Sequence, residues 1–264
     1  MKPDYKNWVP ESLLKGLFAG TALFFIVFIL FGVTGLILHG TVRLICALVP
    51  GIGTLALLFF AVWMTVLYRT FDYKGKRKLA KTIVEGTAEH VRIPDGGVGL
   101  NVGCGSGALT IACAKRNPKA HMTGCDIWSG SYKTVFTKKR CEDNARAEGV
   151  SNVRFEEGNA VKLPFEDESF DAVTSNYVYH NIAGQDKQRL LLETLRVLKK
   201  GGIFAIHDMM SKPRYGDMDV FIQRLRAEGY EDVRLIDTTD GRFMGHKEAV
   251  WLGLAGSALL VGRK

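Results

Sequence analysis

Cysteine is scarce in this chain and follows no metal-binding or disulfide pattern. None of the cysteines forms a CxxC pair, and none has a histidine at the spacing of a metal site. The 264 residues contain five cysteines: Cys46, Cys104, Cys113, Cys125 and Cys141. Structural metal sites need such spacing, and disulfide frameworks belong to small, cysteine-dense secreted chains. We therefore expect free thiols and no metal site. Internal repeats and low-complexity segments are lacking as well.

Charge is missing from two long stretches near the N-terminus, residues 16–38 and 44–68. At about 1.5 Å per residue, about 20 helical residues cross a hydrocarbon core of about 30 Å. Pro50 in the second stretch either kinks a helix or marks its true beginning. A buried helical hairpin of a soluble protein is an alternative. A cleaved signal peptide is disfavoured, because the first stretch is too long and a second follows at once.

Basic residues surround these two stretches unevenly. Only residues 39–43 separate the stretches, so we expect an antiparallel hairpin whose two ends lie on one side. Between the two stretches, at the tip of the hairpin, the only lysine or arginine is Arg43. The two ends carry many more: Lys2, Lys6, Lys15, Arg69, Lys74, Lys76, Arg77, Lys78 and Lys81. The positive-inside rule places both ends in the cytoplasm. We predict an integral protein of the cell membrane, with residues 1–73 as a transmembrane hairpin and 74–264 as a cytoplasmic catalytic domain.

The formal net charge of +8 is therefore partly local, and residues 74–81 form a basic patch beside the membrane. Each such charge contributes about 1 kcal/mol of attraction to anionic lipid. No aromatic-interleaved basic surface or known nucleic-acid module accompanies the patch. The bilayer is thus an expected partner, and a nucleic acid is not expected.

From about residue 76 onward, short β-like runs alternate with helical stretches, which is typical of an α/β domain whose parallel sheet carries helices on both faces. Helices are expected over residues 76–91, 106–116, 185–199 and 218–228, with a further long helix ending near 148. Gly201 and Gly202 would end the helix over 185–199. The expected strands cover residues 98–102, 121–125, 153–156, 170–175, 203–207, 233–237 and 257–262.

A glycine-rich turn follows the first of these strands, where residues 98–107 have the sequence VGLNVGCGSG. Such a turn brings backbone N–H groups and a helix N-terminus against a ligand. Asp126, about twenty residues further on, ends the second strand and can accept both hydroxyls of a ribose. Because Gly103, Gly105 and Ala108 also satisfy the dinucleotide fingerprint, a nicotinamide enzyme is an alternative at this point.

Two downstream segments separate these cofactor classes: GNAVKLPFEDESFDAV at residues 158–173 and LRVLKKGGI at 195–203. Together with the turn and the acid of the second strand, they resemble the class I S-adenosylmethionine-dependent methyltransferases. The likeness is to the type 11 branch, which includes ubiquinone and menaquinone methyltransferases, and it spans about residues 76–264. It implies a Rossmann-like sheet of seven strands with the last one antiparallel, S-adenosylmethionine as cofactor, and methyl transfer as the activity.

The resemblance also implies a role for each position of the cofactor site. The turn would frame the methionine part of S-adenosylmethionine, Asp126 would bind the ribose, and the remaining residues would lie along the adenine and the amino-acid part: Asn101, Gly103, Cys104, Gly105, Gly107, Ile127, Trp128, Asn159, Ala160, Ser175 and Asn176. Trp128 is explained equally well as a helix-packing aromatic. Many family members have an acid where Asn101 and Asn159 stand. Asparagine keeps hydrogen-bonding capacity without charge, so we expect an intact site of weaker affinity.

Residues 177–181, with the sequence YVYHN, lie where family members line the methyl-transfer pocket. His180 is the candidate base or substrate-orienting group, with Tyr179 beside it, although a structurally bonded loop histidine is an alternative. Asp208 is a third catalytic candidate, because ligands sit at the carboxyl ends of parallel strands. A hydroxyl or carbon acceptor needs a nearby base, whereas an amine or thiol needs little more than deprotonation.

A membrane hairpin on a small-molecule methyltransferase favours a lipophilic small-molecule acceptor drawn from the bilayer. Residues 249–256, AVWLGLAG, are apolar enough to lie in the membrane interface, to roof the substrate pocket or to cover the core. Two other functions stay open from the sequence. One is methylation of a membrane-associated protein, and the other is a non-catalytic scaffold that binds S-adenosylmethionine.

Overall fold

The computed structural model describes residues 2–34, 39–129 and 135–264. It divides the chain into two compact units, one of residues 7–78 and the other of the N-terminal residues up to Lys6 together with Leu79–Lys264. The predicted boundary at residue 73 differs from this division in two ways. The main part of the larger unit begins later, at Leu79. The larger unit also includes the short segment up to Lys6, which precedes the hairpin.

The smaller unit is a pair of helices. Helix α1 (Glu11–Val27) continues into a π-helical turn, η1 (Phe28–Val33), and α2 covers Gly40–Phe71. Both are long and apolar enough to cross a membrane. Pro50 lies inside α2 and therefore does not mark its beginning. The first helix starts earlier than predicted, directly after Pro10, and the end of its predicted range, residues 35–38, lies outside the described residues.

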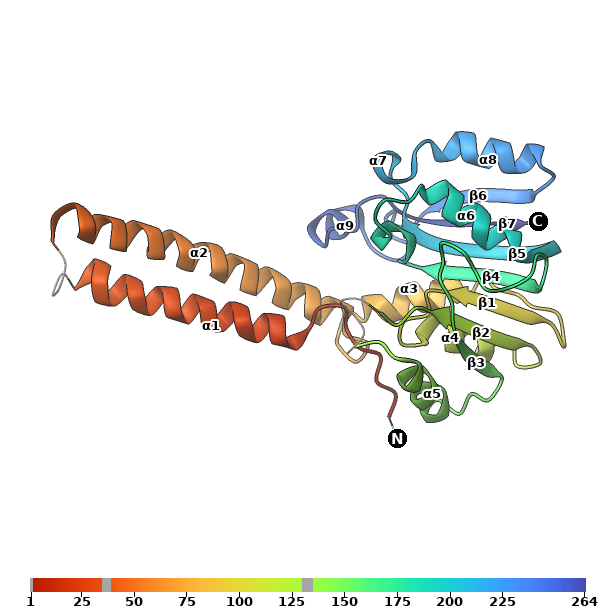
Figure 1. Ribbon diagram of the computed structural model, residues 1–264, viewed down its shortest axis with the longest axis horizontal. Helices are drawn as coiled ribbons and strands as arrows, with labels where there is room; N and C mark the ends of the chain where they lie inside the picture. The colour runs from red at the N-terminus through yellow and green to blue at the C-terminus, as the bar shows by residue number, and fades with distance from the viewer. Residues whose placement is uncertain (1, 35–38, 130–134) are drawn as a thin grey trace. The chain divides into compact units, whose positions relative to one another are not determined.

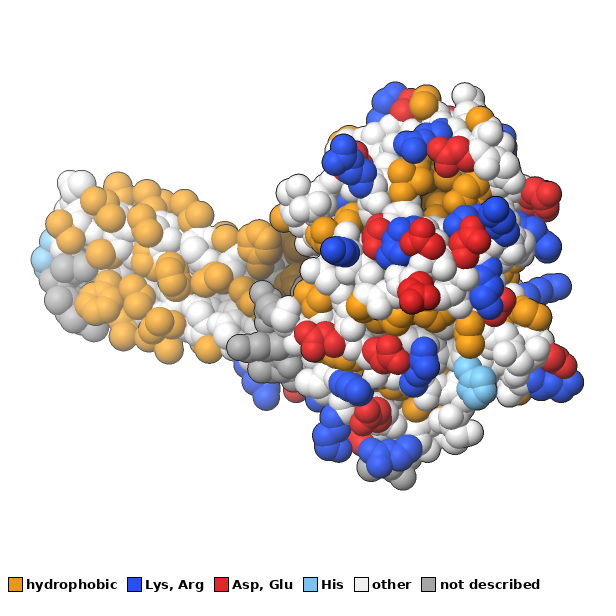
Figure 2. Space-filling view, turned by 45° about the vertical axis from the view of Figure 1, so that its right-hand side comes forward, with side chains coloured by type: hydrophobic (Ala, Val, Ile, Leu, Met, Phe, Trp, Pro, Cys, Tyr) orange, Lys and Arg blue, Asp and Glu red, His pale blue; other side chains and the backbone are white. Residues whose placement is uncertain are grey.

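Small residues and one arginine join the two helices of this unit. A Cβ at Gly32 would lie 2.9 Å from Ala47 Cβ, so η1 and α2 approach closely there. Arg43 donates from Nε to Gly32 O (3.0 Å) and from Nη2 to Val33 O (2.9 Å). Most of the apolar side chains point outward instead, as Ile52 and Leu55 do with exposed fractions of 66% and 69%. Figure 2 shows this apolar surface in orange.

The larger unit is built on one sheet of seven strands (Figure 1). The strands are β1 (Val98–Val102), β2 (His121–Asp126), β3 (Val153–Glu157), β4 (Phe170–Asn176), β5 (Leu198–Met209), β6 (Glu231–Asp237) and β7 (Ser257–Arg263). Their order is β3-β2-β1-β4-β5-β7-β6. Only β7 is antiparallel to its neighbours β5 and β6. The predicted seven-stranded Rossmann-like sheet with an antiparallel last strand is confirmed.

Helices flank this sheet along its length. They are α3 (Leu79–Ala88), α4 (Ala108–Arg116), α5 (Lys138–Ala147), α6 (Lys187–Arg196), α7 (Lys212–Tyr215), α8 (Met218–Ala227) and α9 (His246–Trp251), with a 3₁₀ turn η3 at Tyr179–Asn181. Side-chain oxygens of Thr137, Asp186 and Asp217 cap α5, α6 and α8. Helix α6 ends at Arg196, before the glycines predicted to stop it. Gly201 and Gly202 lie within β5, which begins at Leu198 because that residue pairs with Phe170.

The core lies on both faces of the sheet. On one face, Leu100, Val102 and Phe204 pack with the leucines of α6 and the apolar face of α8. Side chains along a strand alternate between faces, so Asn101 points the other way and meets Thr110 of α4. A smaller cluster on that second face joins Cys104, Ile111, Cys141, Ala145 and Phe155. Helices on both faces were predicted, and the structure has them.

The carboxyl ends of β1, β2, β3, β4 and β5 open onto a common edge. Strand β1 leads through α4 to β2 on one side, whereas its other neighbour β4 leads to β5 in the opposite direction. Such a change of direction leaves a crevice between adjacent strands, where open α/β sheets bind their ligands. Because β6 and β7 run in opposite directions, their connection, which includes α9, reaches the same edge.

Candidate functional site

The glycine-rich turn between β1 and α4 forms the centre of this edge. Gly103 N and Cys104 N both donate to Cys125 O, at 2.8 and 3.0 Å, and Gly107 N donates to Cys104 O at 2.8 Å. The backbone φ angles of Gly103, Gly105 and Gly107 are +70°, +56° and +84°, respectively. This left-handed region is open to glycine and costly for other residues. The side chain of Cys104 is buried, so this residue faces the core and contributes only its backbone to the turn.

The glycines of the turn differ in what surrounds them. A Cβ at Gly103 would lie 2.6 Å from Val178 Cγ1, whereas a Cβ at Gly105 would meet only the ring of Phe136 at 4.0 Å. Gly103 is therefore required by its close contact with the segment after β4. Among the described residues, nothing else comes within 4 Å of that position, so they leave room for a ligand to approach the backbone of Gly105.

Asp126 closes the turn from the end of β2. Its Oδ2 accepts from Gly105 N and its Oδ1 from Trp128 N, each at 2.9 Å. Trp128 has φ of +38°, and its indole Nε1 donates to Gly105 O at 3.1 Å. The ring of Trp128 packs on the Cys104–Phe155 cluster. The structure thus places Trp128 against the turn, whereas Ile127 beside it is 48% exposed.

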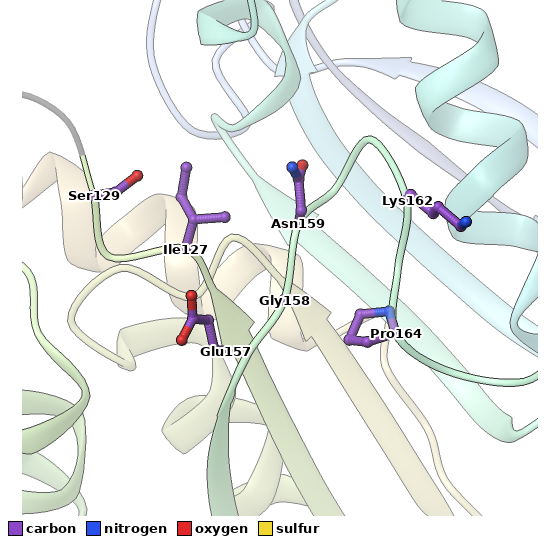
Figure 3. A pocket seen from close by; sticks show the side chains of 7 residues that line it. All are labelled: Ile127, Ser129, Glu157, Gly158, Asn159, Lys162 and Pro164. Carbon is purple, nitrogen blue, oxygen red and sulfur yellow. The ribbon is translucent and has the colours of Figure 1, made fainter.

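A cavity of about 480 Å³ opens next to Asp126. It is lined by Ile127, Ser129, Glu157, Gly158, Asn159, Lys162 and Pro164 (Figure 3). The side chains of Ile127 and Asn159 point to the same side of this cavity (Figure 3). Asn159 Oδ1 accepts from Val161 N at 2.9 Å, and a carboxamide oxygen has a second lone pair for a ligand amino group. An apolar side chain and an amide that point to the same side of a cavity suit a purine ring.

Three predicted cofactor residues lie behind this surface. Asn101 is buried and donates from Nδ2 to Thr110 Oγ1 at 2.9 Å, so it fixes α4 on β1. Its Oδ1 has no partner among the described residues. Ala160 packs into the main core, and Ser175 donates from Oγ to Val102 O at 2.9 Å, tying β4 to β1. These side chains therefore support the site from within the fold.

Asn176 ends β4 and contacts a buried histidine of β5. His207 Nδ1 lies 2.8 Å from Asn176 Oδ1, and His207 Nε2 lies 2.9 Å from Thr238 Oγ1. Burial lowers the pKa of His207 to about 3, although the charge of Asp208 acts in the opposite direction. His207 is thus neutral at ordinary pH, with both ring nitrogens engaged by protein groups.

His180 and Asp208 form a tight pair on the other side of β5. His180 Nδ1 lies 2.5 Å from Asp208 Oδ1. The carboxylate also accepts from the backbone N–H of Tyr179 (2.9 Å), His180 (3.2 Å) and Met209 (2.7 Å). Burial alone would raise the pKa of Asp208, but the hydrogen bond and charge of His180 and the backbone donors lower it. The sequence predicted both residues for this site, and the structure brings them together.

The two tyrosines of the YVYHN segment have different surroundings. Tyr179 is buried in the main core with its hydroxyl 2.7 Å from Thr194 Oγ1, and burial raises its pKa. The structure therefore places the side chain of Tyr179, which the sequence predicted to be catalytic, in the core of the fold. Tyr177 has φ of +54°, and its ring meets His180 edge-on at 5.9 Å and His207 at 4.7 Å. The sequence had not singled out Tyr177, although its position directly after β4 places it at the site edge.

The arrangement fits S-adenosylmethionine. Three features match its parts: an approachable glycine turn at Gly105, a carboxylate at Asp126, and a cavity with an apolar wall at Ile127. His180 lies at the carboxyl end of the neighbouring strand β4. Among the described residues, no group of three or more His, Cys, Asp or Glu side chains could hold a metal ion.

Comparisons with known proteins point to one class of enzyme. Residues 100–206 match a family model described as a methyltransferase domain. A demethylmenaquinone methyltransferase of Geobacillus stearothermophilus is 28% identical over 169 residues, which cover 60% of this chain and 69% of that protein. One of Listeria welshimeri is 35% identical over 123 residues, covering 46% of this chain and 49% of that protein. The chain therefore spans between half and about two thirds of these relatives.

A solved structure shares the fold at low identity. The geranyl diphosphate C-methyltransferase of Streptomyces coelicolor, in complex with S-adenosyl-L-homocysteine, has a TM-score of 0.54 and 14% identity, covering 74% of this chain and 80% of that chain. At this identity the likeness bears on the fold alone. The family model and the two relatives named above are methyltransferases, which agrees with the S-adenosylmethionine interpretation of the sequence over the nicotinamide alternative.

Proposed function

We propose that this chain, which belongs to the class I S-adenosylmethionine-dependent methyltransferases, methylates a lipophilic small molecule or lipid while anchored in the cell membrane. The observation that carries the catalytic part is the pairing of His180 with the buried Asp208 at the carboxyl end of the sheet. The outward-facing apolar hairpin supports the membrane part. The catalytic domain would then lie in the cytoplasm, as the basic residues at both ends of the hairpin favour.

S-adenosylmethionine supplies an activated methyl group, so the protein has to position the acceptor and exclude water. The turn at Gly103–Gly107 would hold the methionine part, and Asp126 would accept from the ribose. Ile127 and Asn159 would hold the adenine, because both line the cavity and their side chains point to the same side of it (Figure 3). Asp126 already orients two backbone donors, so its carboxylate is fixed before a ligand arrives.

His180 is the proposed general base. Asp208 holds its Nδ1, which leaves Nε2 away from the carboxylate, and the side chain of His180 is 16% exposed. A hydroxyl or an activated carbon of the acceptor would lose its proton to Nε2 as it takes up the methyl group. Asp208 would stabilise the resulting imidazolium, because its buried carboxylate remains ionised.

The class of acceptor rests on two independent supports. The curated relatives named above are demethylmenaquinone methyltransferases, whose name gives a lipophilic quinone as substrate. The hairpin of this chain exposes its apolar side chains, whereas a core helix of a soluble protein buries them. A quinone-like ring or another membrane-dissolved acceptor agrees with both.

The test uses the full chain in nanodiscs, radiolabelled S-adenosylmethionine and membrane lipid extract with a reduced quinone. We expect label in the lipid fraction for the wild type. His180→Ala should bind the cofactor normally and transfer methyl roughly 100-fold more slowly, the size of a typical base contribution. Asp126→Ala should lose cofactor binding, as measured by calorimetry. His121→Ala, at the opposite end of β2, is the matched control and should behave as wild type.

Two results would contradict this proposal. Label in membrane proteins instead of lipids would identify a protein methyltransferase. Cofactor binding without transfer to any fraction would identify a scaffold.

A further inference from the structure

The segment that precedes the hairpin packs on the methyltransferase unit, next to its cofactor turn. We call residues 2–6 the N-terminal strap. Tyr5 of the strap packs against the cluster of Cys104, Ile111, Cys141, Ala145 and Phe155. The strap belongs to the same compact unit as the sheet. Figure 1 shows the N-terminal end of the chain beside α5.

Helix α5 receives the strap on side chains spaced four residues apart. Arg140 Nη1 pairs with Asp4 Oδ2 at 2.7 Å, Asn144 Oδ1 accepts from Asp4 N at 2.7 Å, and Tyr5 donates to Glu148 Oε1 at 3.3 Å. Residues i, i+4 and i+8 lie on one face of a helix, so these three form a continuous docking line. Burial, and then the carboxylate of Glu148, raises the pKa of Tyr5, which therefore stays a protonated donor.

Helix α5 also donates hydrogen bonds to the glycine-rich turn at Gly105–Ser106. Asn144 Nδ2 donates to Ser106 O at 2.9 Å and also reaches Asp4 O at 3.3 Å. Cys141 Sγ donates to Gly105 O at 3.1 Å. Asn144 is 2% exposed, so its carboxamide joins the strap to the turn from a buried position.

We propose that the N-terminal strap is a positioning element for the cofactor: its docking on Arg140, Asn144 and Glu148 holds the turn at Gly105–Ser106 in its binding conformation. Only residues 7–10 separate the strap from α1, so the cofactor site is linked along the chain to the membrane hairpin. Binding free energies are reciprocal. If the docked strap raises affinity for S-adenosylmethionine, the cofactor must favour the docked strap by the same factor.

The test is calorimetric titration of the full chain in nanodiscs with S-adenosylmethionine. We expect the Asp4→Ala/Tyr5→Ala variant to bind at least fivefold more weakly, at unchanged stoichiometry. Lys139→Ala is the matched control, because the exposed Lys139 lies on the same helix α5 and pairs with Asp143 there. It should bind as wild type. No acceptor enters this titration, so its result is independent of the proposed acceptor, although it rests on the cofactor of the proposed function.

Hydrogen exchange gives a second readout that a purely structural strap would not change. S-adenosylmethionine should slow exchange of the amides of residues 4–6 in the wild type, and it should have no such effect in Asn144→Ala. Wild-type affinity in the Asp4→Ala/Tyr5→Ala variant, or strap exchange indifferent to the cofactor, would overturn the proposal.

Discussion

Gly103 offers a quantitative test of the cofactor turn, because the chain contains a glycine matched to it in backbone conformation. Gly103 has φ of +70° and Gly96 has φ of +75°. Alanine in the left-handed region costs roughly 1–2 kcal/mol. A Cβ at Gly96 meets none of the described residues within 4 Å, whereas one at Gly103 lies 2.6 Å from Val178 Cγ1. Overpacking adds about 1–3 kcal/mol, so Gly103→Ala should cost about 2–5 kcal/mol and Gly96→Ala only the backbone part.

Urea unfolding of the full chain in detergent, monitored with and without S-adenosylmethionine, measures both effects. Gly103→Ala should also lose cofactor-induced stabilisation, because the turn must move away from Val178, and Gly96→Ala should keep it. Combining Gly103→Ala with Val178→Ala removes the clashing methyl groups. The double variant should recover about 1–2 kcal/mol relative to the sum of the single variants.

Equal losses in Gly103→Ala and Gly96→Ala would refute this reasoning. So would a double variant whose losses simply add, because crowding against Val178 would then not be the cause.

Three further predictions concern the histidines, the carboxylate and the hairpin. The pKa of His207 is lowered to about 3 in the folded chain. As the pH falls from 6.5 to 3, His207 therefore takes up a proton in the unfolded chain but stays neutral in the folded chain. Stability present above pH 6.5 should therefore fall by up to about 4–5 kcal/mol across that window, and His207→Gln should flatten this fall in urea titrations. Asp208→Asn should slow single-turnover methyl transfer about 100-fold and leave the cofactor Kd within about twofold. In a Cys46→Ser background, an impermeant maleimide should label His39→Cys from outside spheroplasts and Lys74→Cys only after lysis, since the other four cysteines are buried.

The strands were predictable because their signal is local. Short runs such as residues 98–102 and 170–175, in which apolar residues predominate or alternate with small polar ones, are mostly buried in the parallel sheet, and their bounds differ from the structure by at most one residue. Short helices were missed. The four residues of α7 and six of α9 are too few to show a period of 3.6. Gly201 and Gly202 were wrongly predicted to end the helix over residues 185–199. Only the pairing of β5 with β4 shows that these glycines belong to a strand.

The cofactor turn was likewise predictable, because its geometry is set by consecutive residues. Gly103, Gly105 and Gly107 take left-handed conformations that few other residues accept. Side-chain direction at the same edge was less accessible. From the sequence, Trp128 and its neighbour Ile127 were equally good candidates to contact a purine. Only the packing in the structure shows that the Trp128 indole points to Gly105 O. The strap was not predictable, because Asp4 and Asn144 are 140 residues apart.

The choice between two histidines for the proposed base follows from the alternation of side chains along β5. His207 and Asp208 are consecutive, so they project from opposite faces of the sheet. On one face, His207 is fully buried between Asn176 and Thr238, and neither ring nitrogen is available. On the other face, Asp208 meets His180, which offers a second nitrogen away from the carboxylate. Of these two histidines, we therefore propose His180 as the base, because it pairs with an ionised carboxylate and keeps one ring nitrogen that the carboxylate does not hold.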